Sequence, residues 1–381
     1  MPWDTSFPTK TRFFQRTREQ VAMAVAKKNQ VIGLDIGSQS IKLVEIDHGK
    51  KGRVLKNFGI IGLPPDAIVE GSIKEMEIVA SAIKTLYRNL KVKNKNVATS
   101  ISGYSVIVKK IEMSDRDESE LENSIQSEAE QYIPFDINDV NLDYDILRTG
   151  AETTEKENKN IAGKMEVMLV AAKKDVVDDY VSLLQLSGLN PAILDVDAFA
   201  LQNAFEASAT EAEGCYALIN VGAEELGINA IKNGVSIFSR DSSYGGNQIT
   251  EAIMSQFDLE FAEAEKIKLG GEKLENEKSA LEEIFTSIIS EWVQEIKRAL
   301  DFLATSYPDE NIQKIMLSGG SSRIPGFRKY LELETNLPVE EMNPFANLLI
   351  NEKAFDSKYL SYMASQAGVA VGLALRSIGD K

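Results

Sequence analysis

The stretch VIGLDIGSQSIKLVEID, residues 31–47, constrains the fold more than any other part of the chain. Apolar residues alternate with other residues on both sides of a short Gly-Ser-Gln-Ser step, which predicts a strand, a tight turn and a second strand. The turn brings Asp35, Gly37 and Lys42 within eight residues. Backbone N–H groups of such a turn bind anions, a lysine adds positive charge, and an aspartate can hold Mg²⁺ through water. The stretch therefore predicts either a phosphate-binding loop or an ordinary hairpin.

A second stretch, CYALINVGAEELGINAIKNGVSIFS at residues 215–239, repeats this pattern. It reads as a strand, an Asn-Val-Gly turn, a second strand, an Asn-Gly turn and a third strand. The distance along the chain from Asp35 to Gly49 equals that from Asn220 to Gly234 in the second stretch. Strand–turn–strand units are common, so chance similarity is one interpretation. We favour the other, a duplicated half-domain.

Length and composition predict a globular protein of more than one lobe. A chain of 381 residues exceeds one ordinary hydrophobic core. It is 43% hydrophobic and 26% charged, as folded proteins are. The net charge of −16 and the lack of a basic patch with interleaved aromatic residues disfavour nucleic acid as a partner.

Single cysteine and histidine residues exclude several kinds of site. One cysteine permits no intrachain disulfide, which suits a reducing compartment. One histidine and one cysteine are too few for a zinc site, and they leave no Ser/His/Asp triad. Neither a signal peptide nor a run of about twenty apolar residues is visible. We expect a cytosolic protein.

The segment 1–30 differs in charge from the remainder. Six basic against two acidic residues give it a net charge of +4. It could form a basic amphipathic helix on anionic lipid, or it could be a loosely ordered extension, which we favour.

Periodicity beyond the first repeat predicts alternating helices and strands. Helices are expected at 76–90, 117–132, 173–186, 198–205, 261–269, 278–303, 327–334 and 359–378, and strands at 97–111 (two, around a Ser-Gly step), 140–147, 165–171, 192–196 and 312–317. The polar stretch 149–163 predicts an exposed loop. The part from 97 to 188 forms a compact α+β unit that interrupts the first lobe.

Four elements carry glycine or an acid at a strand end: Asp35-Gly37, Asp197, Asn220-Gly222 and Gly319-Gly320. In this order they resemble the actin-like ATPase superfamily. The resemblance implies an α/β fold of two lobes with duplicated ribonuclease H-like subdomains. The strand that ends in MLSGGSSRIPGF resembles the adenosine motif of that superfamily.

A narrower resemblance covers about 31–378. The segments GLDIGSQSIKLVEI, SEAEQYIPFDINDVNLDYDIL, LDVDAFAL, AEKIKLGG and SGGSSRIPGF resemble the PilM family of type IV pilus assembly, which is related to FtsA. This implies a cytoplasmic actin-like scaffold, peripherally attached to the inner membrane, that binds the N-terminal cytoplasmic tail of PilN. Through PilN it would connect to the pilus motor ATPases and the inner-membrane platform protein of twitching motility, and it could form homo-oligomers. The alternative is an FtsA-like cell-division protein or another actin-like ATPase with true hydrolytic activity.

The resemblance also implies a division of the chain. The expected parts are a basic N-terminal extension (1–30), a first lobe with the first phosphate loop (31–96), an inserted α+β partner-binding domain (97–188), a connecting helix region (189–212), a second lobe with the second phosphate loop and adenosine motif (213–358), and a C-terminal connecting helix returning to the first lobe (359–381).

The expected ligand is ATP with Mg²⁺, and Asp35 would face the metal through water. The residues expected to contact the nucleotide are Asp35, Gly37, Ser38, Gln39, Ser40, Lys42, Asn220, Gly222, Ala223, Glu224, Glu265, Lys268, Gly319, Gly320, Ser321 and Arg323. Of the second loop, the backbone of Gly222, Ala223 and Glu224 is expected to take part.

Catalysis is expected to be slow at most. Actin-like hydrolases commonly carry an acid in the second phosphate loop, and Asn220 stands there in this chain. An amide has no charge to oppose Mg²⁺ and cannot take a proton. Asp197 remains the candidate catalytic residue that positions water. A small-molecule kinase would need an acceptor pocket with a base, which we do not identify.

Three residues of the inserted unit are expected at the partner site: Tyr132, Ile133 and Phe135. They surround Pro134, which cannot donate to a β-ladder and so ends a helix or marks a bend. Such apolar residues can be core of the small unit, or can line a groove for an extended peptide. We expect at least one of them in the core. Acids of the preceding helix would steer a basic tail toward the groove.

Overall fold

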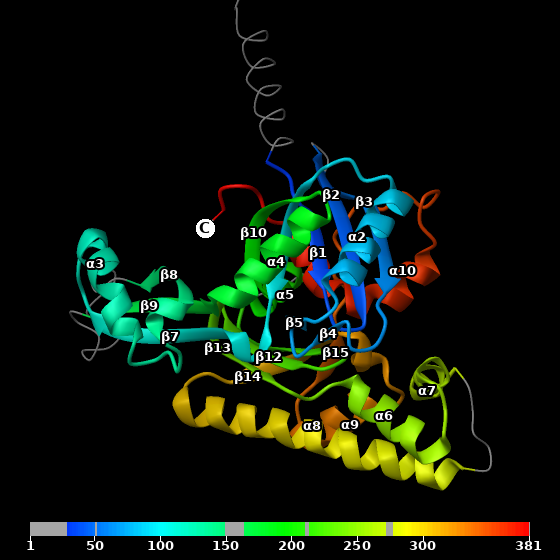
Figure 1. Ribbon diagram of the computed structural model, residues 1–381. Coiled ribbons are helices and arrows are strands. Elements are labelled where there is room, and N and C mark those ends of the chain that lie inside the picture. The colour runs from blue at the N-terminus through cyan, green and yellow to red at the C-terminus, as the bar shows by residue number, and fades with distance from the viewer. Residues whose placement is uncertain (1–28, 50–51, 149–163, 210–212, 272–276, 381) are drawn as a thin grey trace, which may run out of the picture.

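The computed structural model describes residues 29–49, 52–148, 164–209, 213–271 and 277–380. Two five-stranded sheets form the centres of two lobes, and a smaller unit projects from the first lobe (Figure 1). The predictions for the extension 1–30 and the loop 149–163 fall almost entirely outside the described residues.

The first sheet has the order β10-β6-β1-β2-β3. Its strands are β1 (Ile32–Ile36), β2 (Ser40–Gly49), β3 (Gly52–Gly62), β6 (Asn96–Ile101) and β10 (Asn190–Val196). The first three form an antiparallel meander, and β6 and β10 continue the sheet in parallel with β1. A short hairpin, β4 (Ile68–Val69) with β5 (Ser72–Ile73), follows the meander. Every residue of β1 is buried, as expected for a central strand covered on both faces.

The second sheet, β13-β12-β11-β14-β15, repeats this order. It consists of β11 (Cys215–Val221), β12 (Leu226–Lys232), β13 (Val235–Ser242), β14 (Ile312–Ser318) and β15 (Val339–Glu341). Again three strands form a meander and two follow in parallel. The predicted duplication is confirmed.

Helices cover the sheets where the apolar periodicity predicted them. α2 (Met76–Leu90) has the predicted bounds and buries Val79 and Ile83 against the first sheet. The second lobe contains α6 (Gly246–Phe257), α7 (Phe261–Lys268), α8 (Lys278–Ser306) and α9 (Phe327–Thr335). The long α8 runs beneath the second sheet (Figure 1), where Trp292 packs edge-on against Phe327. Within the described part of the chain, no helix combines the length and apolar character that a membrane crossing requires.

Two helices cross between the lobes, α5 (Asp197–Ser208) and α11 (Gly368–Ala374). Their backbones touch: a Cβ added to Gly372 would lie 1.6 Å from the Ala200 carbonyl oxygen. The single helix predicted for 359–378 is wrong. The chain forms α10 (Ser357–Met363), a 3₁₀ turn and then α11, because the turn gives its Ser365 carbonyl to the Gly319 N–H (2.7 Å) and the Ser318 hydroxyl (2.8 Å) of the second lobe.

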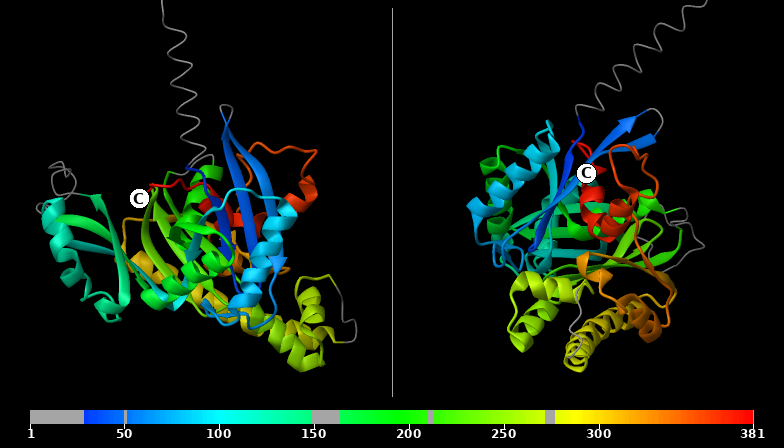
Figure 2. Two further views of the ribbon diagram at one scale, coloured as in Figure 1. Left: turned by 45° about the horizontal axis from the view of Figure 1, so that its top comes forward. Right: turned by 90° about the vertical axis from the view of Figure 1, so that its right-hand side faces the viewer.

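The projecting unit is a three-stranded sheet with one helix on its face (Figure 2). Its strands β7 (Val106–Ser114), β8 (Val140–Arg148) and β9 (Lys164–Lys173) have the order β7-β9-β8. The helix α3 (Glu118–Ala129) begins at Asp117, whose carboxylate accepts the Glu120 N–H at 2.8 Å.

This unit is smaller than the predicted domain 97–188. β6 pairs with β1 and β10 of the first sheet, and α4 (Lys174–Leu186) packs Leu183 and Leu184 into the first-lobe core. The separate core of this unit is formed by residues of β7, α3, β8 and β9 together with Ile133. Alternating apolar residues predict a strand but not the sheet it joins.

Candidate functional site

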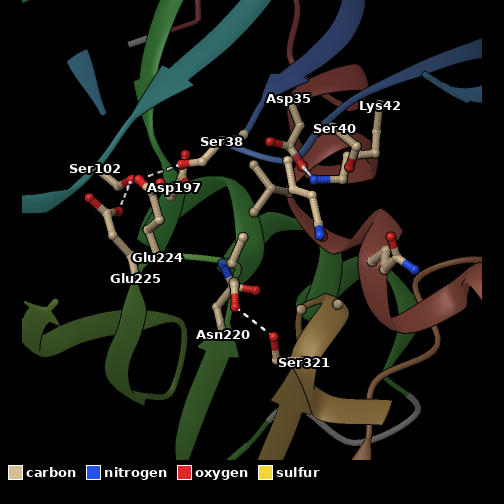
Figure 3. Close-up of a pocket in the computed structure, with 18 of the residues that line it drawn as sticks. Asp35, Ser38, Ser40, Lys42, Ser102, Asp197, Asn220, Glu224, Glu225 and Ser321 are labelled. Atoms are coloured by element: carbon tan, nitrogen blue, oxygen red, sulfur yellow. Dashed lines mark hydrogen bonds and ion pairs between the residues drawn. The ribbon is translucent and has the colours of Figure 1, made fainter. Parts of the chain in front are cut away.

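One cleft between the lobes contains all the residues that the sequence assigned to nucleotide and catalysis (Figure 3). It is lined by the β1–β2 turn, the β11–β12 turn, the end of β14, the start of α5 and the last turn of α7. The predicted residues lining it are Asp35, Gly37, Ser38, Gln39, Ser40, Lys42, Asp197, Asn220, Gly222, Ala223, Glu224, Glu265, Lys268, Gly319, Gly320, Ser321 and Arg323.

An ion pair between Asp35 and Lys42 flanks the β1–β2 turn. Asp35 and Lys42 are opposite each other in the strand register, and their charged groups lie 3.3 Å apart. The turn closes with a hydrogen bond from the Gly37 N–H to the Ser40 carbonyl at 3.2 Å. Asp35 is 8% exposed, so the nearby ammonium group offsets the cost of burying its charge.

The β11–β12 turn contacts the first lobe through the side chain of Glu224. The Glu224 carboxylate accepts the Ser38 hydroxyl at 2.9 Å (Figure 3). It also accepts the Glu70 backbone N–H at 2.7 Å. The sequence predicted a role for the Glu224 backbone, and its side chain makes these contacts. The turn itself is closed by the Gly222 N–H and the Glu225 carbonyl at 2.8 Å.

Two further acids, Glu225 and Asp241, join the lobes at the edge of this cleft. Glu225 accepts the Ser102 hydroxyl at 2.6 Å, and Asp241 accepts the Gly103 N–H at 2.8 Å. Sequence analysis missed both. The paired acids of the second turn were a signal for Glu225, whereas the position of Asp241 depends on the β12–β13 register.

Burial raises the pKa of two carboxyl groups that line the cleft. The pKa of Glu225 is raised to about 8 by burial, which outweighs the hydrogen bond from Ser102. The pKa of Asp197 is raised to about 7, first by burial and then by the charge of Asp35. Asp197, the first residue of α5, therefore carries a carboxyl group that exchanges protons near neutral pH.

On the opposite side of the cleft, Lys268 is fixed among oxygen atoms. Its ammonium group contacts the Glu265 carboxylate, the Thr250 hydroxyl at 2.9 Å and the Gly246 carbonyl at 3.2 Å. The side chain is 3% exposed, and burial lowers the pKa of Lys268. Thr250 and Gly246 were not identified from the sequence, because they belong to a helix rather than to a loop motif.

The end of β14 approaches the second turn closely. The Ser321 hydroxyl donates to the Gly222 carbonyl at 2.7 Å. Gly319 has φ +94°, and an added Cβ would lie 2.2 Å from the Val221 carbonyl oxygen, so glycine is required there. The Arg323 guanidinium stacks on the Tyr362 ring, 4.5 Å from its centroid, at the C-terminal side of the cleft.

The donors fit a magnesium ion bound mostly through water. Among the described residues, no group of three or more His, Cys, Asp and Glu side chains is arranged around one point as a metal site. The Asp35 carboxylate faces the cleft beside the β1–β2 turn. Mg²⁺ keeps several waters and takes one or two carboxylates plus substrate phosphates, so one carboxylate is a sufficient protein ligand.

The predicted partner residues lie in different environments. Ile133 is 6% exposed and belongs to the core of the projecting unit, so it is not available to a partner. Tyr132 and Phe135 are half-buried at its surface. The ammonium group of Lys173 lies 4.6 Å from the centroid of the Phe135 ring and 4.8 Å from that of exposed Tyr104.

Comparison with known proteins decides the family. A family model described as type IV pilus assembly protein PilM matches residues 33–378. The chain belongs to the PilM family. The FtsA-like alternative is not favoured by this match.

Solved structures agree with the PilM assignment and with the fold. A PilM–PilN type IV pilus biogenesis complex is 29% identical, has a TM-score of 0.81, and covers 92% of this chain and 99% of that one. The ethanolamine utilization protein EutJ from Carboxydothermus hydrogenoformans is 14% identical, with a TM-score of 0.52 over 91% of this chain and 89% of that one. The chain has the actin-like fold, as the two matching sheets and the crossing helices indicate.

Proposed function

We propose that this chain is an ATP-binding scaffold of the pilus assembly machinery that binds the cytoplasmic N-terminal tail of PilN. The nucleotide part of the proposal rests on one observation: two matching strand–turn–strand units line the same cleft. Membership of the PilM family and similarity to a PilM–PilN complex over 92% of the chain support the partner.

The nucleotide would lie with its phosphates between the two turns. Gly37, Ser38, Gln39, Ser40 and Lys42 would contact them from the first lobe, and backbone N–H groups of the second turn would contact them from the other side. The adenosine would lie against the end of β14 and α7, near Glu265, Lys268 and Arg323. Asp35 would hold Mg²⁺ through water, and the ion would neutralise phosphate charge.

Turnover of ATP would be slow. Asn220 has no charge to orient a metal-bound water, and Asp197 is the candidate to position one. The raised pKa of Asp197 would suit this carboxyl group to take a proton near neutral pH, so the slow rate would follow from the missing charge at position 220. ATP would then act chiefly by holding the lobes together.

The PilN tail would bind beside the projecting unit. Tyr132 and Phe135 are half-buried aromatic residues there, and Tyr104 adds a third ring at the root of β7. Aromatic side chains with one face exposed are typical anchors for an extended peptide. Recruitment through this tail would keep a cytoplasmic chain at the inner membrane, in contact with the motor ATPases and the platform protein, as a monomer or a homo-oligomer.

Thermal unfolding with and without Mg·ATP tests the nucleotide part. A site occupied at 100 times its Kd adds roughly 2.7 kcal/mol to the free energy of unfolding. Lys268→Met should remove most of this shift. No shift in the native chain at millimolar Mg·ATP would overturn the proposal.

Calorimetry with a synthetic PilN tail tests the partner part. We expect Tyr132→Ala and Phe135→Ala to weaken tail binding at least tenfold, about 1.4 kcal/mol, with unchanged ATP affinity. Phe302→Ala is the matched control, since Phe302 is 53% exposed on α8 of the other lobe. Tail binding that survives both variants would put the groove elsewhere.

A further inference from the structure

Three carboxylates of the second lobe, Glu224, Glu225 and Asp241, accept hydrogen bonds from the first lobe, and we call them the interlobe acids. Their donors are the hydroxyls of Ser38 and Ser102 and the backbone N–H groups of Glu70 and Gly103, at 2.6–2.9 Å. Each of these side chains can accept its hydrogen bond in either protonation state, because a protonated carboxyl group keeps an acceptor oxygen. The acids therefore join the lobes across the cleft.

Glu224 occupies donors that a phosphate would use. Ser38 belongs to the turn to which the proposed function assigns phosphate, and Glu70 precedes Gly71, which lines the same cleft. Carboxylate and phosphate oxygens are both anionic acceptors, so they compete for a hydroxyl and a backbone N–H. They also repel each other when both are close.

Glu225 and Asp241 hold the root of the projecting unit. Ser102 and Gly103 lie between β6 of the first sheet and β7 of the unit. Gly103 has φ +76°, and an added Cβ would lie 2.1 Å from a Glu225 carboxylate oxygen, so the chain passes directly against this acid. β13, which ends at Ser242 just after Asp241, also contacts β7.

We propose that Glu224 substitutes for the terminal phosphate of the nucleotide when none is bound, that this phosphate displaces Glu224 and links the two turns in its place, and that the displacement loosens the hold of Glu225 and Asp241 on the projecting unit. This rests on the proposed nucleotide function and adds a regulation to it. Because Glu224 and Glu225 are adjacent in one turn, a backbone shift of this turn that withdraws the first would also move the second. The nucleotide state would thus reach the part proposed to bind the PilN tail.

Affinities measured by calorimetry test the displacement. Glu224→Ala should bind Mg·ATP about tenfold tighter, because a like charge beside the phosphate is removed, while ADP affinity changes little. Glu283→Ala, which removes an exposed carboxylate of α8, should change neither. If ADP and ATP bind the native chain and Glu224→Ala with unchanged affinities, the displacement is wrong. If neither nucleotide binds either protein, the proposed function fails and the displacement fails with it.

Hydrogen exchange at single amides tests the link to the projecting unit. In the nucleotide-free protein, exchange at Glu70 should accelerate in Glu224→Ala and exchange at Gly103 in Asp241→Ala, because each amide loses its acceptor. Adding Mg·ATP to the native chain should accelerate exchange at Gly103, whereas ADP should not. Unchanged exchange at Gly103 with bound ATP would overturn the link.

Discussion

In the first lobe the acid of the turn, Asp35, is paired with Lys42 of the same hairpin, whereas in the second lobe the equivalent position is Asn220 and the acids of the turn cross into the first lobe. The strand order is otherwise the same in both sheets. The two lobes therefore share one strand arrangement but carry different charged side chains in their turns. The first lobe supplies a neutralised acid and a cation to the cleft, and the second lobe supplies carboxylates that join the two lobes.

This difference explains how two similar loops can perform different tasks. Asp35 beside Lys42 can face a metal without leaving an uncompensated charge. The second turn lacks such a lysine, so its carboxylates obtain hydrogen bonds from the opposite lobe. The following experiments break or sharpen this comparison, and they are given from the largest expected effect to the smallest.

Gly372→Leu should disrupt the packing of α11 against α5, the two helices that cross between the lobes. The added side chain would collide with the α5 backbone at Ala200, and overpacking with backbone displacement should cost more than about 3 kcal/mol of unfolding free energy. Gly62→Ala is the control, because a Cβ there meets nothing within 4 Å. Denaturant unfolding measures both, and equal midpoints would show that the close crossing of α5 and α11 is not needed.

Lys42→Met should show how far the first lobe depends on the ion pair between Asp35 and Lys42. It leaves the Asp35 carboxylate buried without its cation and removes a charge from the phosphate site, so Mg·ATP affinity should fall by about 2–3 kcal/mol. The double variant Asp35→Asn, Lys42→Met should recover much of the lost stability but not the affinity. A single variant with native stability would contradict the pairing.

Asn220→Asp should make the second loop more like the first. An acid at the end of β11 could oppose Mg²⁺ and orient water, so single-turnover hydrolysis should rise about tenfold, below the 10²–10⁴ of a fully placed base. Asn233→Asp is the control, because Asn233 is exposed in the β12–β13 turn and a carboxylate there can still accept the Gly214 N–H that its side chain accepts at 2.8 Å. A native rate near 1 per second, typical of working enzymes, would contradict the expectation of slow turnover.

Glu225→Gln should flatten the pH dependence of stability. The folded protein holds a proton on Glu225 up to about pH 8, whereas the unfolded chain releases it near pH 4.5. The unfolding free energy therefore falls as pH rises between these values, and the amide removes that loss. At pH 8 the variant should gain at least about 1 kcal/mol. Thermal unfolding from pH 5 to 9 measures this, with Glu283→Gln as control. Parallel profiles would show that Glu225 does not titrate as described.

Local patterns were sufficient for most of the elements, and the family resemblance supplied the expected residues of the cleft. The two strand–turn–strand units, the strand before Gly319 and the bounds of α2 follow from short-range chemistry, namely the alternation and spacing of apolar residues. The resemblance to the actin-like ATPase superfamily implied that both turns belong to one nucleotide site. All predicted nucleotide residues line one cleft.

Only the tertiary structure decided which sheet or core each of these elements joins. β6 joins the first sheet rather than the projecting unit, Ile133 is core rather than groove, and the C-terminal helix is interrupted by contacts with the second lobe. Glu225 and Asp241 became part of the site because distant segments bring them to Ser102 and Gly103. Each of these depends on contacts between residues far apart in the chain, and no local periodicity carries information on such contacts.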